Sequence, residues 1–129
     1  MNTNELMALC LDKPGAYIDH PFGDDSTIIK VRKRIFAQFF TLRGKPHATF
    51  NCSAVMGLVY RDMFPEWVRR GYHCPPVQQP YFNTVDLTGG VPGAELLNML
   101  DHAYEWVVSK LPKYVQRELN DNSGDSLSE

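Results

Sequence analysis

Six basic residues stand between positions 30 and 45, in a segment whose alternation of apolar and polar residues indicates β-strands. Cationic side chains on neighbouring hairpins are suited to contact the phosphates of a nucleic acid, and such contacts make binding steeply dependent on salt. Lysines and arginines on exposed strands also discourage edge-to-edge aggregation, which is the competing interpretation. The residues are Lys30, Arg32, Lys33, Arg34, Arg43 and Lys45.

The net charge of the chain hides this concentration. Residues 28–70 hold nine basic and two acidic residues, a local charge of +7, whereas the whole chain carries −2 at pH 7 and its remainder therefore carries −9. A ligand responds to the local potential at short range, so an anionic partner is compatible with overall acidity. Dedicated DNA-binding domains usually carry a positive net charge, which argues against DNA as the partner.

A second candidate site lies in the predicted late strand. Tyr81, Asn83 and Thr84 offer hydrogen-bonding groups to a base or a small ligand. We include Tyr81 and Asn83 with the six basic residues as candidate nucleic-acid contacts. The alternative hypothesis is that a groove near Tyr81, Asn83 and Arg34 binds another protein or a small ligand.

Catalytic chemistry is not indicated by the sequence. His73 and Cys74 are adjacent in a predicted extended segment, so their side chains point apart and do not form a nucleophile with its base. Asp24 and Asp25 sit in a predicted turn without the spacing of a metal loop or an acid–base pair. We expect no enzymatic activity, no metal and no cofactor.

The chain of 129 residues is long enough for one apolar core, and we expect a single domain over residues 1–117 followed by an acidic, flexible tail over 118–129. Its three cysteines lack metal-ligand spacing and cannot all pair with one another. No stretch approaches the roughly 20 apolar residues of a membrane span, and the N-terminus is too polar for a secretory signal. We expect a cytoplasmic monomer that does not enter membranes.

The order of predicted elements indicates an α+β fold, an antiparallel β-sheet with helices packed on one face. A strand-rich meander lies between short helices, and the longest helix, with apolar residues at i, i+3, i+4 and i+7, follows Pro92. Val55, Met56, Val59 and Met63 form one stripe of the helix after Ser53. The predicted helices cover 3–12, 54–64, 92–111 and a short stretch after 112; a short turn covers 66–71; the predicted strands cover 16–22, 27–31, 34–42, 47–52 and 82–87.

Several short motifs, in order and at matching intervals over roughly residues 5–111, resemble the MmcQ/YjbR-like family of small bacterial proteins. They are Lys13-Pro14-Gly15-Ala16, Pro21-Phe22-Gly23, Lys30-Val31, Arg34-Ile35-Phe36-Ala37, Tyr81-Phe82-Asn83-Thr84-Val85, Val91-Pro92-Gly93-Ala94-Glu95-Leu96 and Ala103-Tyr104-Glu105. The resemblance implies a CyaY-like (frataxin-like) fold, also described as a double wing, and a role in DNA binding.

The sequence departs from the family pattern at three places. Lys33-Arg34 stands where the family usually has Gly-Lys, so the turn glycine is lost while the charge is kept. Tyr81-Phe82 replaces a usual His or Lys followed by Trp, and Ala103 replaces a frequent Ser. Because Phe82 stands in place of the tryptophan, this strand lacks the indole N–H donor that the family usually has there.

Overall fold

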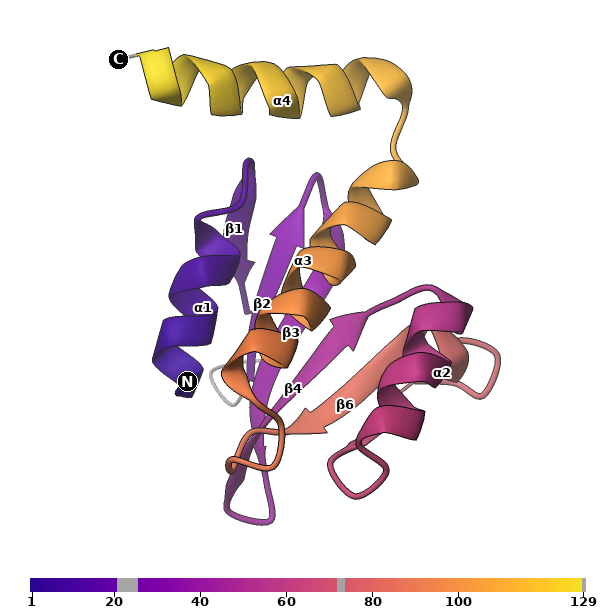
Figure 1. Ribbon diagram of the computed structural model, residues 1–129. Helices are drawn as coiled ribbons and strands as arrows, with labels where there is room; N and C mark the ends of the chain where they lie inside the picture. The colour runs from indigo at the N-terminus through magenta and orange to yellow at the C-terminus, as the bar shows by residue number, and fades with distance from the viewer. Residues whose placement is uncertain (21–25, 72–73, 129) are drawn as a thin grey trace.

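The computed structural model describes residues 1–20, 26–71 and 74–128. It contains one six-stranded antiparallel sheet whose strands lie in the order β1-β2-β3-β4-β6-β5 (Figure 1). The predicted end of the first strand at Pro21 and Phe22, the turn residues 23–25 and His73 lie outside the described residues. The elements are α1 Thr3–Leu11, β1 Ala16–Asp19, β2 Ser26–Val31, β3 Arg34–Leu42, β4 Lys45–Asn51, α2 Ala54–Met63, β5 Val68–Arg70, the 3-10 helix η1 Gln79–Tyr81, β6 Phe82–Asp86, α3 Gly93–Ser109 and α4 Lys113–Ser128.

Helices α1, α2 and α3 cover one face of the sheet, as Figure 1 shows. The core lies between this face and α3, whose buried residues include Leu96, Leu100 and Tyr104. Phe36 of β3 meets the Tyr104 ring edge-on, with 5.4 Å between the ring centroids. The α+β fold with helices on one side of an antiparallel sheet is confirmed. We call the opposite side of the sheet the open face.

Local sequence signals explain where the helices begin. The side chain of Asn2 accepts a hydrogen bond from the backbone N–H of Glu5, and that of Ser53 accepts one from Met56, so each caps the helix that follows. Pro92 precedes the first residue of α3, where its fixed φ suits a helix start. The predicted cap at Ser53 and the predicted start of the long helix are confirmed.

Two hairpins have the shortest turns a β-sheet allows. Arg32-Lys33 joins β2 to β3, and Arg43-Gly44 joins β3 to β4, with Val31 paired to Arg34 and Leu42 paired to Lys45. All four turn residues have positive φ, between 49° and 77°. This is the geometry of a two-residue turn that matches the twist of the flanking strands, and it usually recruits Gly or Asn.

The predicted turn over residues 66–71 is confirmed at Glu66 and Trp67 and is wrong for residues 68–70. Val68–Arg70 forms the edge strand β5, and Val68 pairs with Val85 of β6. Val68 is buried, and pairing with a distant strand decided its conformation where the local sequence indicated only a turn.

Helix α4 continues through the acidic segment that the sequence predicts to be a tail. It lies across the end of the sheet in Figure 1. Leu119 is 2% exposed and belongs to the core. The packed part of the domain therefore extends at least to Leu119, past the predicted boundary at residue 117. In the part of the chain that the structure describes, no helix is long and apolar enough to cross a membrane.

Candidate nucleic-acid interface

Strand β3 separates the six predicted basic residues into two groups. The β2–β3 turn lies at one end of this nine-residue strand and the β3–β4 turn at the other. At about 3.3 Å per residue, the two ends are about 26 Å apart. We call them the α4 end, which carries Lys30, Arg32, Lys33 and Arg34, and the β5 end, which carries Arg43 and Lys45. The single basic surface indicated by the sequence is therefore two surfaces.

Two of the basic residues at the α4 end are neutralised by acids of the protein. Lys30 donates a hydrogen bond to Asp19 at 2.7 Å, which raises the pKa of Lys30 and lowers the pKa of Asp19. Arg32 pairs with Glu118 of α4 at 3.2 Å. The Lys30–Asp19 pair is part-buried and the Arg32–Glu118 pair is exposed, and both reduce the charge that these residues offer to a ligand.

The other cations at this end line a hollow beside the end of α3. We call Lys33, Arg34 and Lys110 the α4-end cluster; Phe82 and Trp106 line the same hollow. The Lys110 ammonium lies 4.1 Å from the centroid of the Trp106 ring, a cation–π contact. Among the described residues none of these three cations forms an ion pair. No acid in the described part of the chain lines the hollow, and its three cations make it positive.

A second hollow lies at the β5 end. Its cations, the β5-end cluster, are exposed and come from two elements far apart in the sequence: Arg43, Lys45, Arg69 and Arg70. Within residues 1–20, 26–71 and 74–128 none of the four forms an ion pair. The sequence suggests that Arg69 and Arg70 complement a helix end, but they lie on edge strand β5.

Two acids, Glu66 and Asp86, also line this second hollow. Burial works to raise the pKa of Asp86, but hydrogen bonds from Thr88 and the nearby His47 and Lys45 outweigh burial and lower it. Asp86 is therefore ionised at neutral pH. Four cations against two acids leave the hollow positive.

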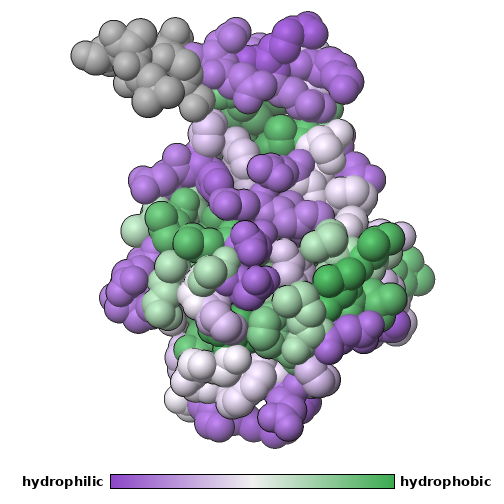
Figure 2. Space-filling view, in the orientation of Figure 1, coloured by the Kyte–Doolittle hydropathy of each residue, from purple (hydrophilic) through white to green (hydrophobic). Residues whose placement is uncertain are grey.

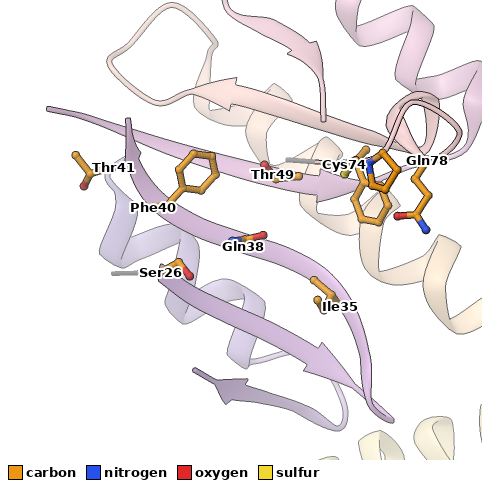
Figure 3. A pocket seen from close by; sticks show the side chains of 10 residues that line it. Ser26, Ile35, Gln38, Phe40, Thr41, Thr49, Cys74 and Gln78 are labelled. Carbon is orange, nitrogen blue, oxygen red and sulfur yellow. The ribbon is translucent and has the colours of Figure 1, made fainter. Parts of the chain in front are cut away.

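Between the two clusters, the open face contains a cavity of about 640 Å³. Figure 3 shows side chains of β2, β3 and β4 along it, with Cys74 and Gln78 at its far side. Thr49 and Thr84 of the open face share a hydrogen bond of 3.0 Å. Ile35 and Phe82 line both the cavity and the positive hollow of the α4-end cluster, so the two spaces are neighbours. The lining residues are Ser26, Ile35, Gln38, Phe40, Thr41, Thr49, Cys74, Pro75, Gln78 and Phe82.

The predicted site residues Tyr81 and Asn83 do not lie on this face together. Asn83 is 3% exposed; its side chain donates to the carbonyl of Gly57 and accepts from Arg61 at 2.7 Å. Tyr81 is exposed at the end of η1. Because side chains alternate along a strand, Phe82 points to the open face and Asn83 to α2. The structure thus does not bring Arg34, Tyr81 and Asn83 into one groove.

Sequence reasoning missed Lys110, Trp106 and Gln38 as members of the candidate interface. Trp106 and Lys110 are four residues apart, and this spacing places them on one face of a helix. That signal was present in the sequence. Nothing local showed that the end of α3 would lie beside the β2–β3 hairpin.

Helix α2 has an apolar outer surface. Val55, Leu58, Val59 and Met63 are 71%, 52%, 38% and 50% exposed. They belong to the hydrophobic area on the right of Figure 2, over α2. Of the predicted stripe, only Met56 packs against the core.

The cysteines are free and unsuited to nucleophilic chemistry. Burial raises the pKa of Cys10 to about 12 and that of Cys52 to about 11, and it also raises the pKa of Cys74. The thiols are therefore protonated at neutral pH. Among the described residues, no group of three histidine, cysteine or acidic side chains is placed to hold a metal ion.

Comparison with known proteins identifies relatives over most of the chain. The chain is 26% identical over 113 residues to the uncharacterised protein YjbR of Escherichia coli K12, covering 88% of this chain and 92% of that protein. A crystal structure of Deinococcus radiodurans protein DR2400 superposes with a TM-score of 0.82 at 24% identity, covering 92% of this chain and 88% of that one. A structure from Pseudomonas syringae gives a TM-score of 0.63 at 14% identity, covering 80% and 96%.

At 24% and 14% identity, these two solved structures are evidence for the fold of the chain and not for its function. The YjbR family model matches residues 11–106, which include the core strands, α2 and most of α3. The chain belongs to the YjbR family.

Proposed function

We propose that the protein binds DNA without enzymatic activity, by contacts between phosphates and the cations at the two ends of β3. One observation carries this proposal: seven cations in the α4-end and β5-end clusters form no ion pair with any described residue. Unpaired cations in two hollows can each neutralise a phosphate and release its counterions.

Backbone strain at the turns supports the proposal. Lys33 and Arg43, one in each turn, have φ of 68° and 53°, in the left-handed region that costs residues with a Cβ about 1–2 kcal/mol each. Gly or Asn would adopt these turns more easily. Strained backbone conformations are enriched at ligand-binding sites, so cations at these positions favour ligand contact.

The separation of the two ends suits a single nucleic-acid ligand. The ends are about 26 Å apart, which is less than the roughly 34 Å of one turn of B-DNA. One ligand can therefore touch both clusters. We place this protein in the cytoplasm, because its three free thiols suit a reducing compartment.

Three matched variants test the proposal, each removing two positive charges and each changing one residue with positive φ. They are Lys30→Gln/Arg32→Gln, Lys33→Gln/Arg34→Gln and Arg43→Gln/Lys45→Gln. The measurement is fluorescence anisotropy of labelled DNA at several salt concentrations. We expect the second and third variants to lose about tenfold in affinity each, and the salt slope to fall by about 1.8. The first variant should bind like wild type, because its cations are already paired.

Two results would contradict the proposal. One is that wild-type protein does not bind DNA at low salt. The other is equal loss in all three variants, because net charge alone would then account for binding. Circular dichroism of each variant checks that the fold is retained.

The outer surface of α2 favours a second function, the binding of a protein partner. Four exposed apolar residues lie on one side of this helix, and η1, which ends at exposed Tyr81, packs against it. Such a partner should bind saturably at moderate salt and be lost on Val55→Asp/Leu58→Asp. Binding that this variant retains but the cationic variants lose would contradict the second function.

A further inference from the structure

We infer that the cavity on the open face holds an unpaired base, so that a single strand of nucleic acid is bound in preference to a duplex. This inference rests on the proposed function and specifies its ligand. The base would lie in the cavity, while the phosphates on either side of it reach the α4-end and β5-end clusters.

The chemistry of the cavity wall matches a nucleobase. A base has two apolar faces and an edge of hydrogen-bond donors and acceptors. The cavity presents apolar Ile35, Pro75 and Phe82 together with the side-chain amides of Gln38 and Gln78. No charged residue lines it within the described part of the chain. An acyl chain would bury these amides without partners, which is costly.

The two amides are available to a ligand. Gln38 and Gln78 make no side-chain hydrogen bond to any described residue, whereas the neighbouring Gln79 donates to the carbonyl of Cys74. Gln38 is half-buried in the middle of β3, where Figure 3 shows its side chain on the open face between Phe40 and Ile35. A half-buried amide without a partner gains most from a base edge, which offers both donors and acceptors.

Size and position agree with this ligand. A volume of about 640 Å³ falls within the range of small-molecule sites, roughly 300–1,000 Å³, and exceeds what one base fills. Phe82 separates the cavity from the positive hollow of Lys33 and Arg34, so a base against Phe82 has its phosphate near these cations. A closed duplex keeps its bases stacked and paired, and it cannot place one in the cavity.

The distance between the clusters sets an expected ligand length. About 26 Å corresponds to about eight nucleotides at the 3.4 Å spacing of a stacked strand. Affinity for oligothymidylates should therefore increase with length up to about eight nucleotides and then change little.

The test compares a labelled 12-nucleotide single strand with its duplex, by anisotropy at one salt concentration. We expect wild type to bind the single strand at least about tenfold more tightly, because base stacking on an aromatic ring strengthens binding. Phe82→Leu should lose about tenfold for the single strand. Gln38→Leu changes a residue that lines the cavity but not the hollow of the α4-end cluster, so it should lose about threefold for the single strand and keep duplex affinity within about twofold. Tyr114→Leu is the matched control, since Tyr114 is an exposed aromatic residue of α4 outside the cavity, and it should bind both ligands as wild type does.

The outcomes separate failure of the inference from failure of the proposed function. Binding of neither ligand overturns both. Equal affinity for the two ligands, unchanged by Phe82→Leu, overturns the base site and leaves phosphate binding intact. If Phe82→Leu does not fold, Gln38→Leu decides: a loss of about threefold confined to the single strand supports the site, and no loss overturns it.

Discussion

The two ends of β3 have the same kind of turn but differ in how many of their cations are neutralised by acids of the protein. Each is a two-residue turn with positive φ, bordered by basic residues. At the α4 end, Asp19 and Glu118 neutralise Lys30 and Arg32. At the β5 end, Arg43 and Lys45 stay unpaired with respect to the described residues and are joined by Arg69 and Arg70 of β5. Charge counted along a sequence is therefore not the charge that a surface offers to a ligand.

The largest expected effect on DNA affinity follows from removing cations at both ends of β3 in one variant. The variant Lys33→Gln/Arg34→Gln/Arg43→Gln/Lys45→Gln should lose about a hundredfold in DNA affinity, because distant sites contribute additively. Its slope of log affinity against log salt should fall by about 3.6. Salt titrations of the four-site variant and of both two-site variants measure this. If the second pair has no effect once the first is removed, one end alone binds.

Substituting two comparable glycines tests how Leu119 of α4 packs against Gly15, which precedes β1. Gly15 and Gly44 have φ of 76° and 77°, but a Cβ at Gly15 would lie 2.7 Å from Leu119, whereas no described residue would lie within 4 Å of a Cβ at Gly44. Gly44→Ala should lower the free energy of unfolding by about 1 kcal/mol through backbone strain alone. Gly15→Ala should lower it by about 2 kcal/mol because Leu119 must also move. Urea unfolding measures both free energies. Equal losses would show that the Leu119 contact contributes nothing.

Exchanging the turn residues sharpens the comparison further. Lys33 and Gly44 occupy the same position of equivalent turns, both with positive φ. Lys33→Gly should raise the free energy of unfolding by about 0.5–1 kcal/mol, and Gly44→Lys should lower it by about 1 kcal/mol. Lys33→Gly should also weaken DNA binding. A more stable variant with undiminished affinity would show that Lys33 does not contact the ligand.

Removing the acids of the α4 end should change DNA affinity less, and in the opposite direction, by increasing it. Asp19→Asn frees Lys30, and Glu118→Gln frees Arg32, so each variant should bind DNA about two- to threefold more tightly at low salt. Anisotropy measures the gain. Glu66→Gln at the β5 end is the control for removing one negative charge. If affinity is unchanged on freeing Lys30 or Arg32, those cations lie outside the path of the ligand.

The smallest effect concerns acid pH. The hydrogen bond from Lys30 holds the pKa of Asp19 below its ordinary value of 3.8. The stabilisation from this pair is therefore present above about pH 4 and lost as pH falls through the lowered pKa. Asp19→Asn should remove this part of the pH dependence below about pH 4, as acid unfolding followed by circular dichroism can measure. Identical acid unfolding curves would contradict the pair's role.

Much of the fold was predictable because its signals are local. Ser53 caps α2, Pro92 begins α3, and the alternation in residues 34–42 predicts β3 with the bounds observed. β5 was not predictable, because three residues become a strand only through pairing with β6. The candidate basic residues were visible in the sequence, but the number that remain unpaired was not.

The buried role of Asn83 illustrates the same limit. Its position in a strand was predicted, and either face of that strand was compatible with the local pattern. The location of α2 against β6 placed the amide between Gly57 and Arg61 and left Phe82 on the open face. A contact that depends on the packing of a helix is absent from the strand's own sequence.

The sequence by itself determined α1, α2 and α3 and the hairpins with their basic residues, because propensity, alternation and capping act over a few residues. It also contained the motifs of the family. Only the tertiary structure decided which cations remain unpaired, where the cavity lies and how α4 packs. Arg32 and Glu118 meet although 86 residues separate them in the chain. Such pairings depend on how all the elements pack together, and no short segment contains that information.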